Sequence, residues 1–176
     1  LGSKYPWALG RPASEVWSEI WPAIGPRIAG VLTTGEATWD EGLLLFLERS
    51  GYQEETYHTF SYSPLRDEIG DVVGMLCVVT EDTERVISTR RMSTLSGLGG
   101  ALSTAQGERQ VVTAACSALA RDGHNLPFTM LFSFDEHDVA RLVGSTGAPS
   151  GAVADPSTWP LGELTAGRSV LVDDLG

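Results

Sequence analysis

The spacing of apolar residues predicts two short helices near the start of the chain. Apolar residues recur at three- and four-residue steps at Val16, Trp17, Ile20, Trp21, Ile24, Ile28, Val31 and Leu32. Ser14 can cap the first helix, and Gly35 can end the second. Pro22 should break or kink the pattern near Trp21, because proline lacks an N–H and clashes with the preceding turn.

From residue 36 the pattern changes to that of β-strands. Residues 38–49 have an aliphatic centre, and residues 55–65 alternate so that His58, Phe60 and Tyr62 share one face. Pro64 should end this second strand, because it has no N–H to give to the ladder. Residues 72–79 form an apolar run of the length of a buried strand. Three sequential strands with short turns predict an antiparallel meander.

Residues 83–105 follow the third strand and predict a helix. Apolar side chains recur along it at Val86, Ile87, Met92, Leu95 and Leu102. This helix could form a short parallel coiled coil between two protomers, or it could pack on its own domain, and the pattern leaves both open. A hinge is favoured at the glycine-rich residues 97–100.

The remaining chain predicts a second α+β arrangement. Residues 108–121 form an amphipathic helix with Val111, Val112, Ala115, Cys116 and Leu119 on its inner face. Residues 128–135 and 139–145 alternate as a hairpin, with a turn at 135–138. A loop at 147–156, the segment 159–164, a short strand at 169–172 and a turn at 173–174 complete the pattern.

The first half of the chain resembles the C-terminal two-thirds of a PAS domain. The resemblance is carried by the order helix, long strand, hairpin and exit helix, and by the stretch SPLRDEIGDVVGMLCVVTEDTER. It implies an antiparallel half-barrel sheet with flanking helices over residues 1–82, whose first two strands would precede residue 1. At the exit the family commonly has Asp-Ile-Thr, whereas this chain has Glu81, Asp82 and Thr83.

Residues 104–176 resemble the first half of a GAF domain. The similar features are the opening helix, the strand ARLVGSTG and the segment WPLGELTAGRSVLVDDL, which would lie near the ligand side. The resemblance implies a PAS-like domain at 1–82, a connecting signalling helix at 83–105 and a partial GAF-like α/β sandwich at 106–176. The chain begins at Leu1 and stops just after a strand-like run, so we expect it to be a piece of a longer protein.

Composition narrows the classes of partner. The 176 residues are 42% hydrophobic and 20% charged, which is typical of a globular protein. Twelve basic and 23 acidic residues give a net charge of −11, which argues against binding to nucleic acid or anionic lipid. No apolar segment is long enough to span a membrane. Cys77 and Cys116 lie in apolar surroundings, so we expect buried free thiols and a cytoplasmic protein.

The sequence contains no recognisable catalytic constellation. His58, His124 and His137 lack the spacing of metal ligands, no CxxC accompanies them, and no phosphate-binding glycine loop or nucleophile elbow is present. We therefore predict that this fragment is not itself an enzyme and holds no metal; the sequence does not identify a cofactor. The predicted ligand pocket is lined by the strand residues Phe46, His58, Phe60, Tyr62, Met75 and Cys77.

The resemblance implies a sensory and regulatory function. A small ligand or a partner would bind the PAS-like sheet, and Glu81, Asp82, Thr83 and Leu95 would relay the signal along the helix to a C-terminal output domain, as in bacterial sensor histidine kinases. The expected assembly is a homodimer through that helix. Two alternatives stay open: a dimerisation or protein-interaction module without a ligand, and the sensor part of a PP2C-type phosphatase.

Overall fold

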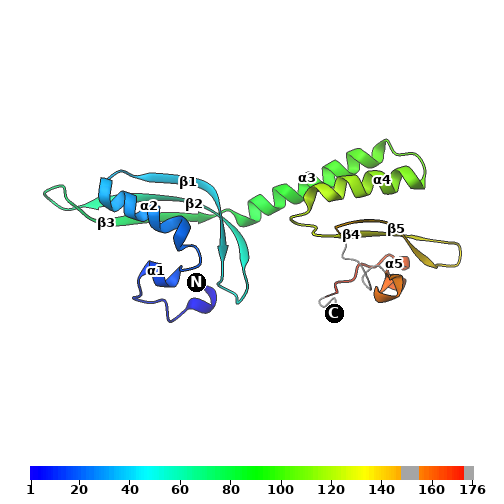
Figure 1. Ribbon diagram of the computed structural model, residues 1–176, viewed down its shortest axis with the longest axis horizontal. Helices are drawn as coiled ribbons and strands as arrows, with labels where there is room; N and C mark the ends of the chain where they lie inside the picture. The colour runs from blue at the N-terminus through cyan, green and yellow to red at the C-terminus, as the bar shows by residue number, and fades with distance from the viewer. Residues whose placement is uncertain (148–154, 173–176) are drawn as a thin grey trace. The chain divides into compact units, whose positions relative to one another are not determined.

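A three-stranded antiparallel sheet forms the centre of the first half of the chain (Figure 1). The computed structural model describes residues 1–147 and 155–172. Its strands β1 (Thr38–Leu47), β2 (Glu54–Arg66) and β3 (Val72–Glu81) pair in the order β1-β2-β3. This confirms the predicted meander. Both β1 and β3 are edge strands of this sheet.

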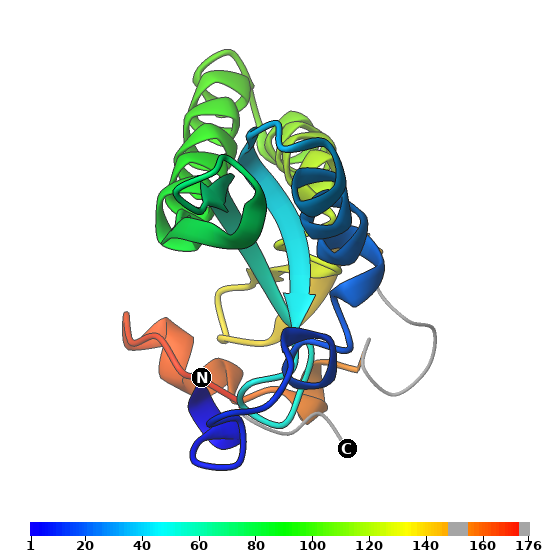
Figure 2. The ribbon, with the colours of Figure 1, turned by 90° about the vertical axis from the view of Figure 1, so that its left-hand side faces the viewer.

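One face of the sheet is covered by α2 (Trp21–Thr34), as Figures 1 and 2 show. The short helix α1 (Ala13–Val16) precedes it, so the predicted interruption near Trp21 is present. Pro22 lies at the start of α2, where its missing N–H costs nothing, but Pro26 is accommodated inside the helix. The core between α2 and the sheet consists of Ile20, Ile24, Val31, Leu45, Leu47, Phe60 and Tyr62.

The first twelve residues are anchored to this core by a buried lysine. They contain the short 3₁₀ helix η1 (Gly2–Lys4). The Lys4 Nζ donates to the backbone oxygen of Val16 and to the carboxylate of Glu19, and it lies 4.6 Å from the centre of the Trp17 ring. Pairing and hydrogen bonding of this kind allow a charge to be buried. The first twelve residues are therefore held against the start of the helical segment.

Two expectations about strands β2 and β3 are wrong. Pro64 does not end β2 but pairs with Met75 of β3 within the ladder. The pairing with β1 stops at Tyr62, so one edge of β2 is open at Pro64 and a residue without an N–H is tolerated there. The apolar run of β3 is not buried either, since Val73, Leu76, Val78 and Val79 are all at least half exposed. No strand among the described residues covers its outer edge.

The second half of the chain contains a helix over a two-stranded hairpin. Its elements are α4 (Glu108–Leu119), η2 (Ala120–Asp122), β4 (Thr129–Phe134) and β5 (Ala140–Thr146). The predicted helix and antiparallel hairpin are confirmed. Val111 is exposed, however, and the buried residues of α4 are Ala115 and Ala118.

Beyond the hairpin, the described residues form η4 (Pro156–Thr158) and α5 (Leu161–Thr165). Residues 169–172 have no strand, contrary to expectation, because none of the described strands pairs with them. Most of the predicted loop at 147–156 and the turn at 173–174 lie outside the described residues.

A single helix, α3 (Thr83–Ser103), follows β3. It runs unbroken through residues 97–100, where the sequence favours a hinge. The chain divides into two compact units, Leu1–Ser88 and Thr89–Gly176, and the division falls within α3. The fold class is therefore α+β, with a three-stranded and a two-stranded antiparallel sheet.

Candidate functional site

The first unit contains a pocket of about 350 Å³ between the sheet and the helical segment. This volume lies at the small end of the range of about 300–1,000 Å³ that is usual for small-molecule sites. Its apolar wall is formed by Trp17, Ile24, Leu45, Leu47, Phe60, Tyr62, Cys77 and Val79. Arg49, His58 and Glu81 add a polar end.

The polar end is organised by Arg49, which is two residues beyond the end of β1. Its Nη1 and Nη2 donate to the two carboxylate oxygens of Glu81 over 2.7 and 2.8 Å, and its Nε donates to Glu54 over 2.9 Å. Bidentate pairs of this kind are strong and geometrically specific. Hydrogen bonds from Arg49 hold the pKa of Glu81 at about 2. The hydrogen bonds that Arg49 donates to Glu81 and Glu54 raise the pKa of Arg49.

Glu81 also connects the pocket to the start of α3. Its Oε1 accepts a hydrogen bond of 3.0 Å from the Thr83 hydroxyl, and the same hydroxyl accepts the Tyr57 N–H over 3.0 Å. The Asp82 N–H donates to the Tyr57 carbonyl over 2.7 Å, and the Asp82 carboxylate accepts the Thr59 hydroxyl. Asp82 and Thr83, the two residues that follow Glu81 and lead into α3, are therefore both hydrogen-bonded to β2.

Two further polar side chains in the pocket are affected by burial. Burial lowers the pKa of His58 below its usual value, although the nearby Glu81 carboxylate acts in the opposite direction. Burial raises the pKa of Tyr62 to about 12. Both groups are therefore neutral at pH 7.

Four of the six residues predicted to bind a ligand lie together in this pocket: His58, Phe60, Tyr62 and Cys77. Met75 packs against the adjoining core. Phe46 lies on the opposite face of the sheet and is 44% exposed. Cys77 lines the pocket but is exposed, and Cys116 is half-buried, so neither is the buried thiol that the sequence predicts; both are free.

The position of Phe46 follows from a β-bulge in β1. Asp40 pairs with Phe60 and Leu43 pairs with His58, so one extra residue lies between them at Glu41 and Gly42. This insertion turns Leu43, Leu45 and Leu47 toward the pocket side and Phe46 away from it. A glycine within a strand pattern is the sequence signal for such a bulge, and Gly42 has a φ of 58°.

Several lining residues were not predicted from the sequence as ligand contacts. Leu45 and Leu47 face the pocket because of the bulge. Val79 faces it because it lies two residues after Cys77 on the same face of β3. Trp17 belongs to the helical pattern and reads as a core residue. Arg49 could not be assigned, because its partner Glu81 is 32 residues away in the sequence.

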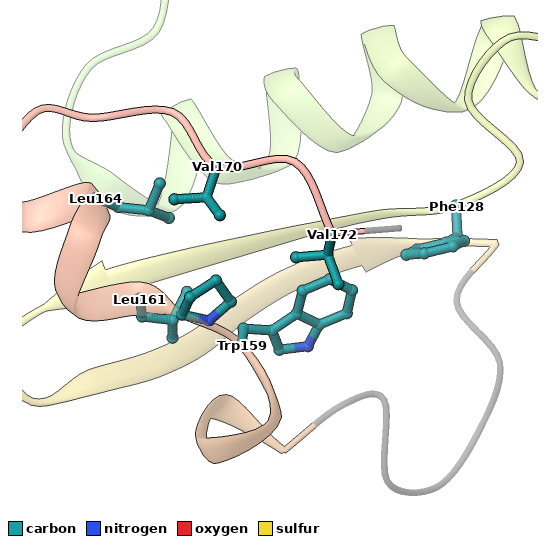
Figure 3. A pocket seen from close by; sticks show the side chains of 7 residues that line it. Phe128, Trp159, Leu161, Leu164, Val170 and Val172 are labelled. Atoms are coloured by element: carbon teal, nitrogen blue, oxygen red, sulfur yellow. The ribbon is translucent and has the colours of Figure 1, made fainter. Parts of the chain in front are cut away.

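The second unit contains an apolar pocket of about 280 Å³ (Figure 3). The described residues that line it are Phe128, Trp159, Pro160, Leu161, Leu164, Val170 and Val172. The rings of Phe128 and Trp159 lie 6.5 Å apart. No charged side chain is among these residues, so this pocket offers less to orient a ligand than the pocket of the first unit.

No group of three or more His, Cys, Asp or Glu side chains within residues 1–147 and 155–172 could hold a metal ion. In the same part of the chain, no helix combines the length and apolar character that crossing a membrane requires. Comparison with known proteins found no matching family model and no matching curated protein.

Proposed function

We propose that this chain is the sensory part of a bacterial signal-transduction protein, in which a PAS-like unit is followed by a connecting helix and the first part of a GAF-like unit. A small ligand or partner binds the pocket of the first unit, and α3 carries the response toward an output domain such as a histidine kinase. The chain itself performs no catalysis in this proposal. Its free cysteines are in keeping with a cytoplasmic location.

The observation that carries the proposal is the double role of Glu81. The same carboxylate lines the pocket, accepts both terminal nitrogens of Arg49 and accepts the hydroxyl of Thr83 in the first turn of α3. A ligand that changes the arrangement of Arg49 and Glu81 therefore changes a contact of α3. The mechanism is a population shift, whose size is limited by the difference in ligand affinity between two arrangements.

A filled pocket should alter the start of α3. Val79→Trp places a bulky side chain in the pocket, and Val78→Trp is a matched control, because Val78 is the adjacent β3 residue on the opposite face and the two are 57% and 56% exposed. We expect amide exchange over residues 83–88 to change by about fivefold or more in Val79→Trp alone. Equal exchange in both variants would show that the pocket and α3 are not coupled.

A second candidate is a dimerisation or protein-interaction module without a ligand. It is favoured by the exposed apolar side chains of Met92 and Leu95 on α3. A native mass spectrum and an absorbance scan of the purified chain distinguish the candidates, because unexplained added mass or a chromophore supports sensing. The sensor part of a PP2C-type phosphatase differs from the first proposal only in its output domain.

A further inference from the structure

His58 is the pocket residue with unused hydrogen-bonding capacity. It is 9% exposed and lies in the pocket wall, and its Nδ1 is buried with no hydrogen-bond partner among the described residues. Unpaired buried polar atoms are uncommon in native proteins, because burial without a partner costs free energy. The unpaired Nδ1 therefore indicates a missing partner.

The position of Glu81 determines what kind of partner is missing. The Nε2 of His58 lies 3.9 Å from the Glu81 carboxylate, too far for a hydrogen bond but close enough for the negative charge to favour a proton on Nε2. The imidazole is neutral at pH 7, because burial lowers its pKa. Nδ1 is then an acceptor, and its partner must be a donor.

The charges around the pocket argue against an anionic ligand. Arg49 is the cationic side chain of the pocket, and its Nε, Nη1 and Nη2 already donate to Glu54 and Glu81. One guanidinium thus faces two carboxylates, which leaves a negative surplus beside His58. Apolar and aromatic side chains form the rest of the wall.

We propose that this pocket binds a small neutral ligand that has an apolar body and one N–H or O–H donor, and that Nδ1 of His58 accepts that donor. The inference rests on the proposed function, since it assigns the ligand of the same sensory pocket. Nδ1 has almost no exposed surface in this structure. The donor therefore reaches it through rotation of the imidazole about the Cβ–Cγ bond, a torsion with broad preferences in histidine.

That rotation also provides a link to the relay. Turning the ring moves Nε2 relative to the Glu81 carboxylate, which accepts from Arg49 and Thr83. A ligand without a donor would fill the pocket but leave the imidazole in place. A donor therefore adds the movement of the imidazole to the change that filling the pocket produces on its own.

Indole and indene test the inference, because they are neutral bicyclic molecules of similar shape and only indole has an N–H donor. Titration of the chain by NMR should show indole binding about tenfold more tightly than indene, the effect of one hydrogen bond to a buried acceptor. Indole-3-carboxylate should bind more weakly than indole. The resonance of the His58 Nδ1 should shift with indole and not with indene.

His58→Phe keeps an aromatic ring and removes both nitrogens, so it should bind indole and indene with equal affinity. His137→Phe is the matched control, because His137 is an exposed turn residue of the second unit, and it should keep the tenfold preference. Equal binding of the two probes to the wild type, or an unmoved Nδ1 resonance, overturns the inference but leaves the sensory pocket standing. Absence of binding by any probe, together with equal exchange in the Val78 and Val79 variants, overturns both.

Discussion

Glu81 belongs both to the wall of the pocket and to the start of the helix that leaves it. Its carboxylate accepts three hydrogen bonds, two from Arg49 and one from Thr83. Because each oxygen of Glu81 accepts from Arg49, the carboxylate cannot turn toward a ligand without losing one of these bonds. This is the physical reason why the pocket and α3 are expected to respond together.

Acidification should lower the folding stability of the first unit, because Glu81 becomes protonated. The pKa of Glu81 is held at about 2, below its ordinary value of 4.5, mainly by hydrogen bonds from Arg49. Because the folded-state pKa is the lower one, the stabilising contribution of Glu81 is complete above about pH 4.5 and is lost as the pH falls through about 2. We expect the urea midpoint to fall more steeply over this interval in the wild type than in Glu81→Gln. Unfolding in urea can be followed by tryptophan fluorescence.

Other carboxylates contribute in the same direction, so only the difference between the two proteins reports on Glu81. The pKa values of Glu19, Glu54 and Asp82 are also lowered in the folded chain. Glu84→Gln is a suitable control, because Glu84 is an exposed residue in the first turn of α3. Its profile should match the wild type. Parallel profiles for wild type and Glu81→Gln would show that the Arg49 pair adds no stability.

The positions of the strands in the sequence could be predicted. Which side chains of β1 face the core could not. Alternation in β2 correctly groups His58, Phe60 and Tyr62 on one face, because the ladder there is regular. In β1 the inserted residue reverses the alternation, so Leu45 and Leu47 face the core where uninterrupted alternation would place Phe46. Gly42 marks the bulge, but a glycine in a strand is also compatible with a regular ladder.

The exposure of β3 could not be predicted for a different reason. An apolar run looks the same in a central strand and in an edge strand, because burial depends on elements that are distant in sequence. The pairing of Arg49 with Glu81 is equally non-local. Local patterns therefore predict the strands of the pocket and the residues that lead into α3 separately. The folded chain shows that Glu81 both lines the pocket and contacts the start of α3.

In the second unit, α4 packs closely on β5 at Gly144. A Cβ built at this glycine would lie 2.7 Å from the Cys116 Sγ and 2.8 Å from a methyl carbon of Val112, both on α4. Gly144→Ala should therefore force the helix and hairpin apart and destabilise this unit by about 1–3 kcal/mol. Amide exchange of β4 and β5 as a function of urea would measure the loss.

Gly123→Ala provides the comparison for this packing. Gly123 has a φ of −59°, and a Cβ there would meet no atom within 4 Å. The substitution should leave the stability of the second unit nearly unchanged. If Gly144→Ala behaved in the same way, the close contact between α4 and β5 would contribute little to holding the unit together.

For the chain as a whole, α3 is the element through which both the proposed sensing and the proposed dimer would act. Its first turn is bonded to the pocket strands through Thr83, and Thr94 donates to Asp122 over 2.6 Å within the second unit. Neither bond involves the apolar side chains of Met92 and Leu95, which are exposed. The sequence leaves two arrangements of this helix open, packing on its own domain or pairing with a second protomer. Because Met92 and Leu95 are not covered by the described part of the chain, they remain available for the second arrangement.

Leu95→Lys tests whether this surface holds two copies together. Leu95 is 61% exposed, and in a paired α3 it would be buried once in each protomer. Loss of two buried leucine side chains should raise the dimer dissociation constant by roughly tenfold or more, measured by sedimentation equilibrium. Ser96→Lys adds the same charge at the neighbouring exposed position and should change the constant much less. If both variants weakened the dimer equally, net charge rather than the Leu95 contact would control association, and if neither did, α3 would not be the interface.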